Sequence, residues 1–184
     1  MEVFDLKSIT DSIKELKKTT TLVMTALMVA MGVVLHSFAT IPISTELMFK
    51  WAFLPMAVVG MLYGAVPAAI CGGLIDLIST LILPKASGGF MFGITFCMMV
   101  SGFLYGLFLY KAEKLTTRVV LCTATNFILV TMLLTTAVLS VNYGSEFITM
   151  FVRRLLKAAL LPIEVALLIP VLKMLKKRLK NFRL

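Results

Sequence analysis

Long runs of apolar residues, separated by short polar or charged segments, dominate the chain. Because the hydrocarbon core of a bilayer is about 30 Å thick and an α-helix rises about 1.5 Å per residue, a run of about 20 apolar residues can cross it. The pattern predicts six membrane-spanning helices. We expect them at about residues 21–38, 51–62, 66–83, 91–110, 119–140 and 147–172.

A different pattern precedes the first span. Leu6, Ile9, Ile13 and Leu16 recur at helical spacing among charged residues. This indicates an amphipathic helix that lies on the inner membrane surface or docks under the bundle. A solvated face without a partner is the alternative. We therefore divide the chain into an amphipathic cytoplasmic segment at 1–18, a six-helix membrane domain at 19–173 and a basic cytoplasmic tail at 174–184.

The composition agrees with lipid as the solvent. Of the 184 residues, 60% are hydrophobic and 15% charged, whereas a soluble domain is nearer half apolar and a quarter charged. A chain this short has too little interior to bury so much apolar surface. We expect an all-α integral membrane protein, a multi-pass six-helix bundle.

Basic residues flank the apolar runs and give a net charge of +9. Cytoplasmic segments of membrane proteins carry an excess of Lys and Arg. With both termini in the cytoplasm, 13 of the 18 Lys and Arg residues lie inside. The positive charge therefore sets the topology and does not indicate a nucleic-acid partner. These inner residues are Lys7, Lys14, Lys17, Lys18, Lys111, Lys114, Arg118 and six in the C-terminal tail, Lys173, Lys176, Lys177, Arg178, Lys180 and Arg183.

Three cations interrupt this bias near the outer end of the sixth span: Arg153, Arg154 and Lys157. Charges inside a membrane protein are costly and normally face the bundle interior, a water-filled cavity or a partner. Arginine can hold a carboxylate through two parallel hydrogen bonds. The three residues therefore predict a site for an anionic ligand. Pairing with Glu146 or Glu164, or extension to the lipid headgroups, is the structural alternative.

Other candidate ligand-binding residues lie between the middle of the bundle and its outer openings. Asp76, near the middle of the third span, could hydrogen-bond a polar ring or tie two helices together. Aromatic residues near the outer openings could stack on a flat ring or form an interfacial belt. These candidates, with polar residues of the fifth span, are Asp76, Lys50, Trp51, Phe90, Phe92, Phe96, Asn126 and Thr131.

Two alanines, Ala26 and Ala30, lie one turn apart in the first span. Small residues at this spacing let another helix approach closely. That helix could belong to the same bundle or to a separate subunit.

Several kinds of chemistry have no sequence signature here. The chain lacks the G-x-x-x-x-G-K-[ST] motif of ATP-binding proteins and any nucleophile–base set. Cys71, Cys97 and Cys122 have no metal-ligand spacing and accompany a single histidine, His36. We predict no catalytic activity, cofactor or metal site.

Taken together, these motifs resemble one family, the substrate-binding S components of energy-coupling factor vitamin transporters, and most closely the folate-specific type. The resemblance extends over nearly the whole chain. It rests on Ser12-Ile-Lys-Glu-Leu-Lys-Lys18 with Ala26 and Ala30, Lys50-Trp-Ala-Phe-Leu-Pro55, Gly60-Met-Leu-Tyr-Gly64, Gly73-Leu-Ile-Asp76, Gly89-Phe-Met-Phe-Gly93, Ser101-Gly-Phe-Leu-Tyr-Gly-Leu-Phe-Leu-Tyr110, Arg153-Arg-Leu-Leu-Lys157 and Pro162-Ile-Glu164.

The resemblance implies a six-helix bundle of the bacterial cell membrane that binds its vitamin in a pocket near the outer face. It also implies a membrane coupling subunit and two cytoplasmic ATPases as partners, with Ala26 and Ala30 at the docking surface. In a folate complex, the aromatic residues would stack on the rings and the cations would meet the glutamate tail. Pantothenate, riboflavin or a queuosine precursor is the alternative ligand. A membrane enzyme acting on lipid and a scaffold without a ligand are alternatives from other classes.

Overall fold

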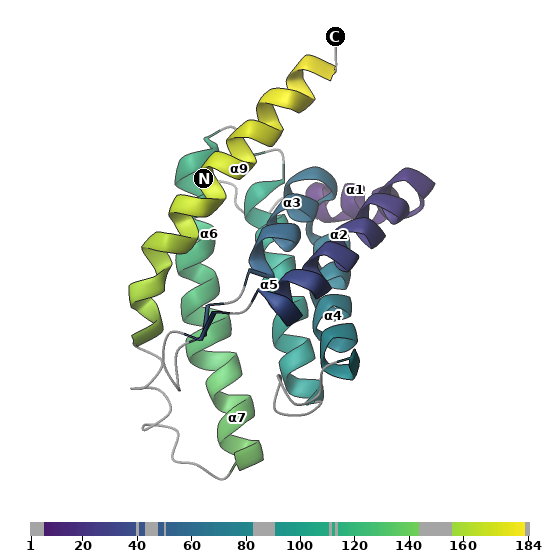
Figure 1. Cartoon of the computed structure of the whole chain (residues 1–184). Coiled ribbons are helices and arrows are strands. Elements are labelled where there is room, and N and C mark those ends of the chain that lie inside the picture. Colours follow the sequence, from purple (N-terminus) through teal and green to yellow (C-terminus); the bar gives the residue numbers. More distant parts are fainter. Residues whose placement is uncertain are drawn as a thin grey trace.

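Six apolar helices form the bundle (Figure 1). The computed structural model describes residues 6–39, 41–42, 48–49, 51–82, 91–110, 112, 114–143 and 156–182. Within these ranges five helical segments are long and apolar enough to cross a membrane, and a shorter apolar helix completes the set. The six-helix prediction is confirmed. The long segments are α2 (Thr19–Phe38), α4 (Ala65–Ile82), α5 (Phe92–Leu109), residues 115–143 and α9 (Leu161–Phe182), and the short helix is α3 (Phe53–Tyr63).

Two short strands of two residues each lie between α2 and α3 in the chain. Strand β1 (Ile41–Pro42) pairs antiparallel with β2 (Met48–Phe49). Helix α3 then begins at Phe53, so Pro55 lies in its first turn. Proline is tolerated there because the amide groups of a first turn have no partner within the helix. The proline therefore does not interrupt the short second span.

The fifth span is continuous but changes its helical type. Helix α6 (Leu115–Asn126) passes into a π-helix, η1 (Phe127–Leu134), and then into α7 (Thr135–Tyr143). The Thr135 hydroxyl donates a 2.8 Å hydrogen bond to the carbonyl of Val130, five residues earlier. The Thr136 hydroxyl does the same with Thr131 at 3.2 Å. Both side chains therefore supply hydrogen bonds to backbone carbonyls in the wider turns.

The sixth span differs most from its predicted range, 147–172. Residues 147–155 lie outside the described ranges, and a short 3-10 helix, η2 (Leu156–Leu160), precedes α9. Helix α9 continues ten residues beyond the predicted end, to Phe182. Lysine and arginine are good helix formers and are favourable near a helix C-terminus. The apolar run thus ended before the helix did.

Glycines bring α5 against its neighbours. A Cβ atom added at Gly106 would collide with the backbone of Ala65, and one at Gly102 with the carbonyl oxygen of Ala68. A Cβ atom at Gly60 would lie 2.8 Å from the backbone nitrogen of Gly106. Small residues permit such close contact between membrane helices. They fix the register of α5 against both α3 and α4.

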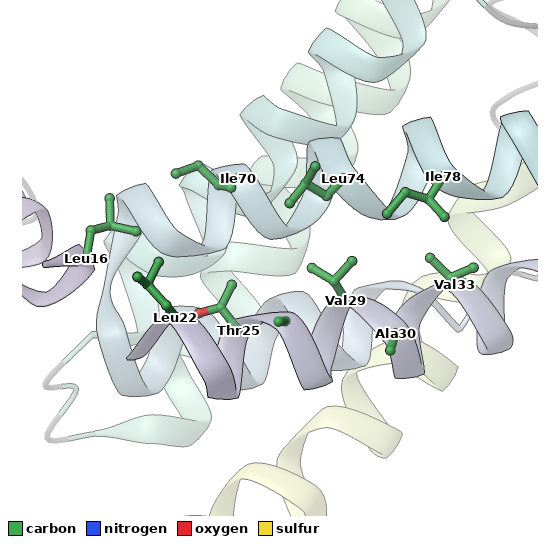
Figure 2. Close-up of a pocket in the computed structure, with 10 residues that line it drawn as sticks. Leu16, Leu22, Thr25, Val29, Ala30, Val33, Ile70, Leu74 and Ile78 are labelled. Atoms are coloured by element: carbon green, nitrogen blue, oxygen red, sulfur yellow. The ribbon is translucent and has the colours of Figure 1, made fainter. Parts of the chain in front are cut away.

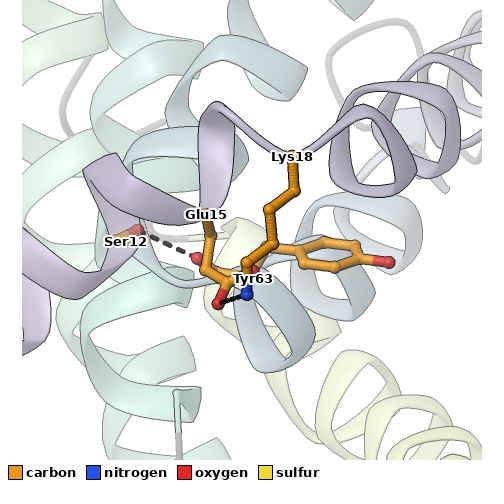
Figure 3. Close-up of polar contacts among 4 residues, drawn as sticks. All are labelled: Ser12, Glu15, Lys18 and Tyr63. Atoms are coloured by element: carbon orange, nitrogen blue, oxygen red, sulfur yellow. Dashed lines mark hydrogen bonds and ion pairs between the residues drawn. The ribbon is translucent and has the colours of Figure 1, made fainter.

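Helix α1 (Leu6–Leu16) docks at the turn between α3 and α4 (Figure 3). The buried Ser12 hydroxyl donates to the carbonyl of Tyr63 at 3.0 Å and accepts from the amide of Val66 at 3.2 Å. Gly64 between them has a φ of +93°, a conformation that favours glycine. Of the sequence alternatives for this helix, docking under the bundle is the one observed.

Candidate functional site

A buried carboxylate lies between α4 and α5. Asp76 is 5% exposed, and Thr95 of α5 donates a 2.8 Å hydrogen bond from its hydroxyl to Asp76 Oδ2. Asp76 lies eleven residues after the start of α4 at Ala65, or about 16 Å along the helix axis. Helix α1 docks at the first turn of α4, and the charge distribution of the sequence predicts that this end faces the cytoplasm. With this orientation, the Asp76–Thr95 pair lies slightly beyond the midpoint of α4, toward its outer end.

Two further polar side chains are buried one turn nearer the outer end of α4. Ser79 is 1% exposed and Thr80 is 5% exposed. The Ser79 hydroxyl has no hydrogen-bond partner among the residues that the structure describes. An unsatisfied buried polar group costs about 1–3 kcal/mol. This hydroxyl and the Asp76 carboxylate are therefore the candidate contacts for a polar ligand, and that role stays a prediction.

Thr95 and Ser79 were missed in the sequence analysis. Ser79 and Thr80 follow Asp76 by three and four residues, and this spacing places polar side chains on one helical face. That signal was available. The pairing of Asp76 with Thr95 had no comparable signal, because it depends on the register between two helices.

The predicted aromatic residues occupy two different environments. Trp51 precedes α3, is half-buried and packs against the main apolar core. Phe92 and Phe96 are on the first turns of α5 and are 78% and 54% exposed. Trp51 therefore contributes to the packing of the core, and its ligand role stays a prediction. The exposed phenylalanines also fit the belt alternative, and their ligand role stays a prediction.

Asn126 ties two helices together. Its side-chain amide donates to the Ser101 hydroxyl at 2.9 Å and to the Ser101 carbonyl at 3.4 Å. Thr131 is half-buried in the π-helix, where its carbonyl accepts the Thr136 hydroxyl. The contact with Ser101 gives Asn126 a structural role, and a ligand role for Asn126 or Thr131 stays a prediction.

The remaining predicted site residues lie outside the described part of the chain. Lys50, Phe90, Arg153 and Arg154 are in this group. Lys157 belongs to η2 just before α9, and its side chain is also outside the described residues. The proposed clamp for an anionic ligand therefore stays a prediction.

The candidate docking residues line an apolar groove. Ala26 and Ala30 are exposed on α2, at the edge of a cavity of about 650 Å³ between α2 and α4. Figure 2 shows Ile70, Leu74 and Ile78 of α4 in a row opposite the residues of α2. The groove thus opens on the outside of the bundle, where small side chains leave room. Its lining comprises Leu16, Leu22, Thr25, Ala26, Val29, Ala30, Val33, Ile70, Leu74 and Ile78.

The described residues contain no group of three His, Cys, Asp or Glu side chains that could hold a metal ion. Cys71, Cys97 and Cys122 are free thiols, each buried in the bundle. Free cysteine behaves as a small apolar residue in such positions. Their observed environment agrees with a packing role.

The fold and the site define a class: a multi-pass membrane protein with buried polar side chains between two central helices and an apolar groove along its first span. The family model described as the ECF-type riboflavin transporter, S component, matches residues 16–173. The chain belongs to the S components of ECF-type transporters. It is therefore a vitamin-binding transport subunit rather than an enzyme, as expected from the sequence.

Two relatives are named for another vitamin. The folate transporter FolT of Clostridium novyi (strain NT) is 29% identical over 146 residues, which cover 79% of this chain and 83% of FolT. The crystal structure of FolT bound with folic acid matches with a TM-score of 0.73 and 30% identity, over 82% of this chain and 91% of the solved one. The similarity to the folate transporters thus covers most of the bundle.

Proposed function

We propose that this S component binds folate in the outer half of its bundle and delivers it across the membrane. The observation that carries the proposal is the similarity to the FolT structure bound with folic acid, at a TM-score of 0.73. The Clostridium novyi FolT relative supports the same ligand. Folate has a flat pterin, an aromatic spacer and a glutamate tail with two carboxylates, so its two ends need different partners.

The polar residues of α4 and α5 suit the pterin end. A pterin ring presents N–H donors along one edge, and the Asp76 carboxylate is an acceptor held in place by Thr95. Ser79, one turn away, can donate or accept a further hydrogen bond. Hydrogen bonds that involve a charged partner contribute about 1.5–3 kcal/mol each. Asp76 therefore supplies the strongest contact of this set.

The opposite end of folate needs positive charge. Arg153, Arg154 and Lys157 are the cations that the sequence places near the outer end of the sixth span. Arginine forms paired, charge-assisted hydrogen bonds with a carboxylate. We assign the glutamate tail to one or more of these three residues, and the ring-stacking role to Trp51.

Riboflavin is the second candidate, because the matching family model is described as a riboflavin transporter S component. Riboflavin carries a flat ring but no carboxylate tail. It would use Asp76 and Trp51 but would give the three cations no partner. The two ligands therefore differ in their dependence on Arg153 and Arg154.

Delivery requires other subunits, since the chain carries no ATP-binding motif. We propose that a membrane coupling subunit docks on Ala26 and Ala30, whose small side chains leave the surface of α2 open to a second helix. Two cytoplasmic ATPase subunits would complete the importer.

Mass spectrometry of the ligand retained on protein purified from folate- and riboflavin-containing medium tests the ligand assignment. We expect folate to be recovered in a near-stoichiometric amount. Recovery of riboflavin with no folate would overturn the proposal and favour the second candidate.

A further inference from the structure

The groove between α2 and α4 has the length of one membrane leaflet. Its lining on α2 runs from Leu22 to Val33, eleven residues apart, or about 16 Å along the helix. Half of a bilayer's hydrocarbon core is about 15 Å. Leu16 of α1 closes the inner end of the groove (Figure 2). The groove therefore begins at the cytoplasmic interface and extends through about one leaflet.

The inner end of the groove is positively charged. Lys17 and Lys18 form the connection between α1 and α2, so they lie in the chain between two lining residues, Leu16 and Leu22. Both lysines are exposed. Lys18 bonds Glu15 at 2.7 Å, as Figure 3 shows, whereas Lys17 has no ion-pair partner within the described part of the chain. A positively charged side chain at the membrane surface thus lies next to the inner end of the apolar groove.

We propose that this groove binds one anionic phospholipid of the cytoplasmic leaflet. One acyl chain lies between α2 and α4, against Val29 and Leu74, and the phosphate headgroup contacts Lys17 and Lys18. The cavity of about 650 Å³ lies within the range of about 300–1,000 Å³ that is typical of small-molecule sites. The negative charge of the headgroup complements the positive charge of the lysines. The length of the groove matches the depth to which an acyl chain enters one leaflet.

The same groove contains Ala26 and Ala30, so lipid and coupling subunit cannot occupy it together. The bound lipid would cover this surface in the free subunit and leave when the coupling subunit docks. This exchange rests on the proposed docking role of the alanines. Lipid binding itself rests only on the groove and the lysines.

Native mass spectrometry of the full chain, released from a mild detergent, tests the lipid site. The probes are phosphatidylglycerol and phosphatidylcholine, added separately without vitamin or coupling subunit. Leu74→Trp fills the groove, and Leu81→Trp is its control, because Leu81 is an exposed residue of α4 outside the groove lining. Ile70→Trp is a second groove-filling variant in case Leu74→Trp does not fold.

We expect one phosphatidylglycerol per protein, retained in preference to phosphatidylcholine. A groove-filling tryptophan that excludes two methylene groups lowers lipid affinity about tenfold, while Leu81→Trp leaves it unchanged. Lys17→Gln with Lys18→Gln lowers the affinity for phosphatidylglycerol by roughly fivefold for each lysine. Lys173→Gln with Lys177→Gln, on exposed positions of α9, is the matched charge control.

Two results would overturn the proposal. Equal lipid retention by Leu74→Trp, Ile70→Trp and Leu81→Trp would mean that the retained lipid belongs to the general lipid shell of a membrane protein and is not bound in the groove. Equal retention of phosphatidylglycerol and phosphatidylcholine by the unaltered chain would exclude the headgroup contact. Neither result bears on folate binding, which is measured separately.

Discussion

Thr95 of α5 donates a 2.8 Å hydrogen bond to the buried carboxylate of Asp76 on α4, across the interface between two central helices. Isolated carboxylates are rare within membrane spans and usually mark a ligand path or a partner. The contact can be interpreted in two ways: it serves only to link the two helices, or it positions the carboxylate as a hydrogen-bond acceptor for the pterin. Substitutions at the two positions separate them.

Asp76→Asn removes the charge and keeps the shape of the side chain. If the carboxylate binds the pterin, folate affinity falls by about 10- to 100-fold, because a hydrogen bond to a charged group contributes about 1.5–3 kcal/mol. Thr95→Val should weaken binding less, since the carboxylate remains. Fluorescence titration gives the affinity and thermal unfolding gives the stability. A lower unfolding temperature with unaltered folate affinity would support the helix tie alone.

Ser79→Ala tests the buried hydroxyl that has no partner in the described residues. The free protein should keep or gain stability, because an unsatisfied buried polar group is removed. Folate affinity should fall by roughly fivefold, the equivalent of one neutral hydrogen bond.

Ser101→Ala is the matched control for Ser79→Ala. It removes the 2.9 Å partner of Asn126 and should therefore lower the stability by about 1–3 kcal/mol without affecting folate binding. The opposite pattern, with Ser101→Ala losing folate and Ser79→Ala keeping it, would place the ligand between α5 and α6 instead.

Arg153→Ala with Arg154→Ala tests the assignment of the glutamate tail. The double variant should lose at least about tenfold in folate affinity, because charge-assisted hydrogen bonds to the carboxylates disappear. Its unfolding temperature should change little. Pteroic acid amide, which lacks the glutamate and carries no carboxylate, serves as the control ligand and should bind both proteins equally. Equal folate binding by the two proteins would eliminate the clamp.

Ala26→Leu with Ala30→Leu tests the docking surface. Larger side chains would keep a second helix away from α2, so vitamin uptake by cells should be abolished. Folate binding by the purified subunit should persist, since both alanines are exposed on α2 whereas Asp76 is buried between α4 and α5. Loss of binding together with uptake would assign the alanines to packing within the bundle.

The positions of the spans could be predicted from the sequence because lipid imposes a length on every apolar run. α2, α4 and α5 each begin and end within two residues of their predicted limits. The end of α9 was missed, because basic residues end the apolar run without ending the helix. The π-helix was missed too, since its residues are as apolar as those of an α-helical span.

The site was less predictable than the spans. Asp76 and Trp51 were proposed as ligand-binding residues from residue type and depth, and that role stays a prediction. The partner of Asp76 depends on how α4 and α5 align. That alignment is set by backbone contacts at Gly102 and Gly106, which no single-helix pattern specifies. Only the α2 wall of the groove beside Ala26 could be predicted from the sequence, because the other wall consists of ordinary apolar residues of α4.

The central claim is that this subunit holds folate inside its outer half. The chain contains a single tryptophan, Trp51, so its fluorescence reports on that region without interference from other indoles. Titration of the purified protein with folate should quench Trp51 at a one-to-one ratio, and excess riboflavin should not displace the folate. Quenching by riboflavin, with no response to folate, would contradict the account.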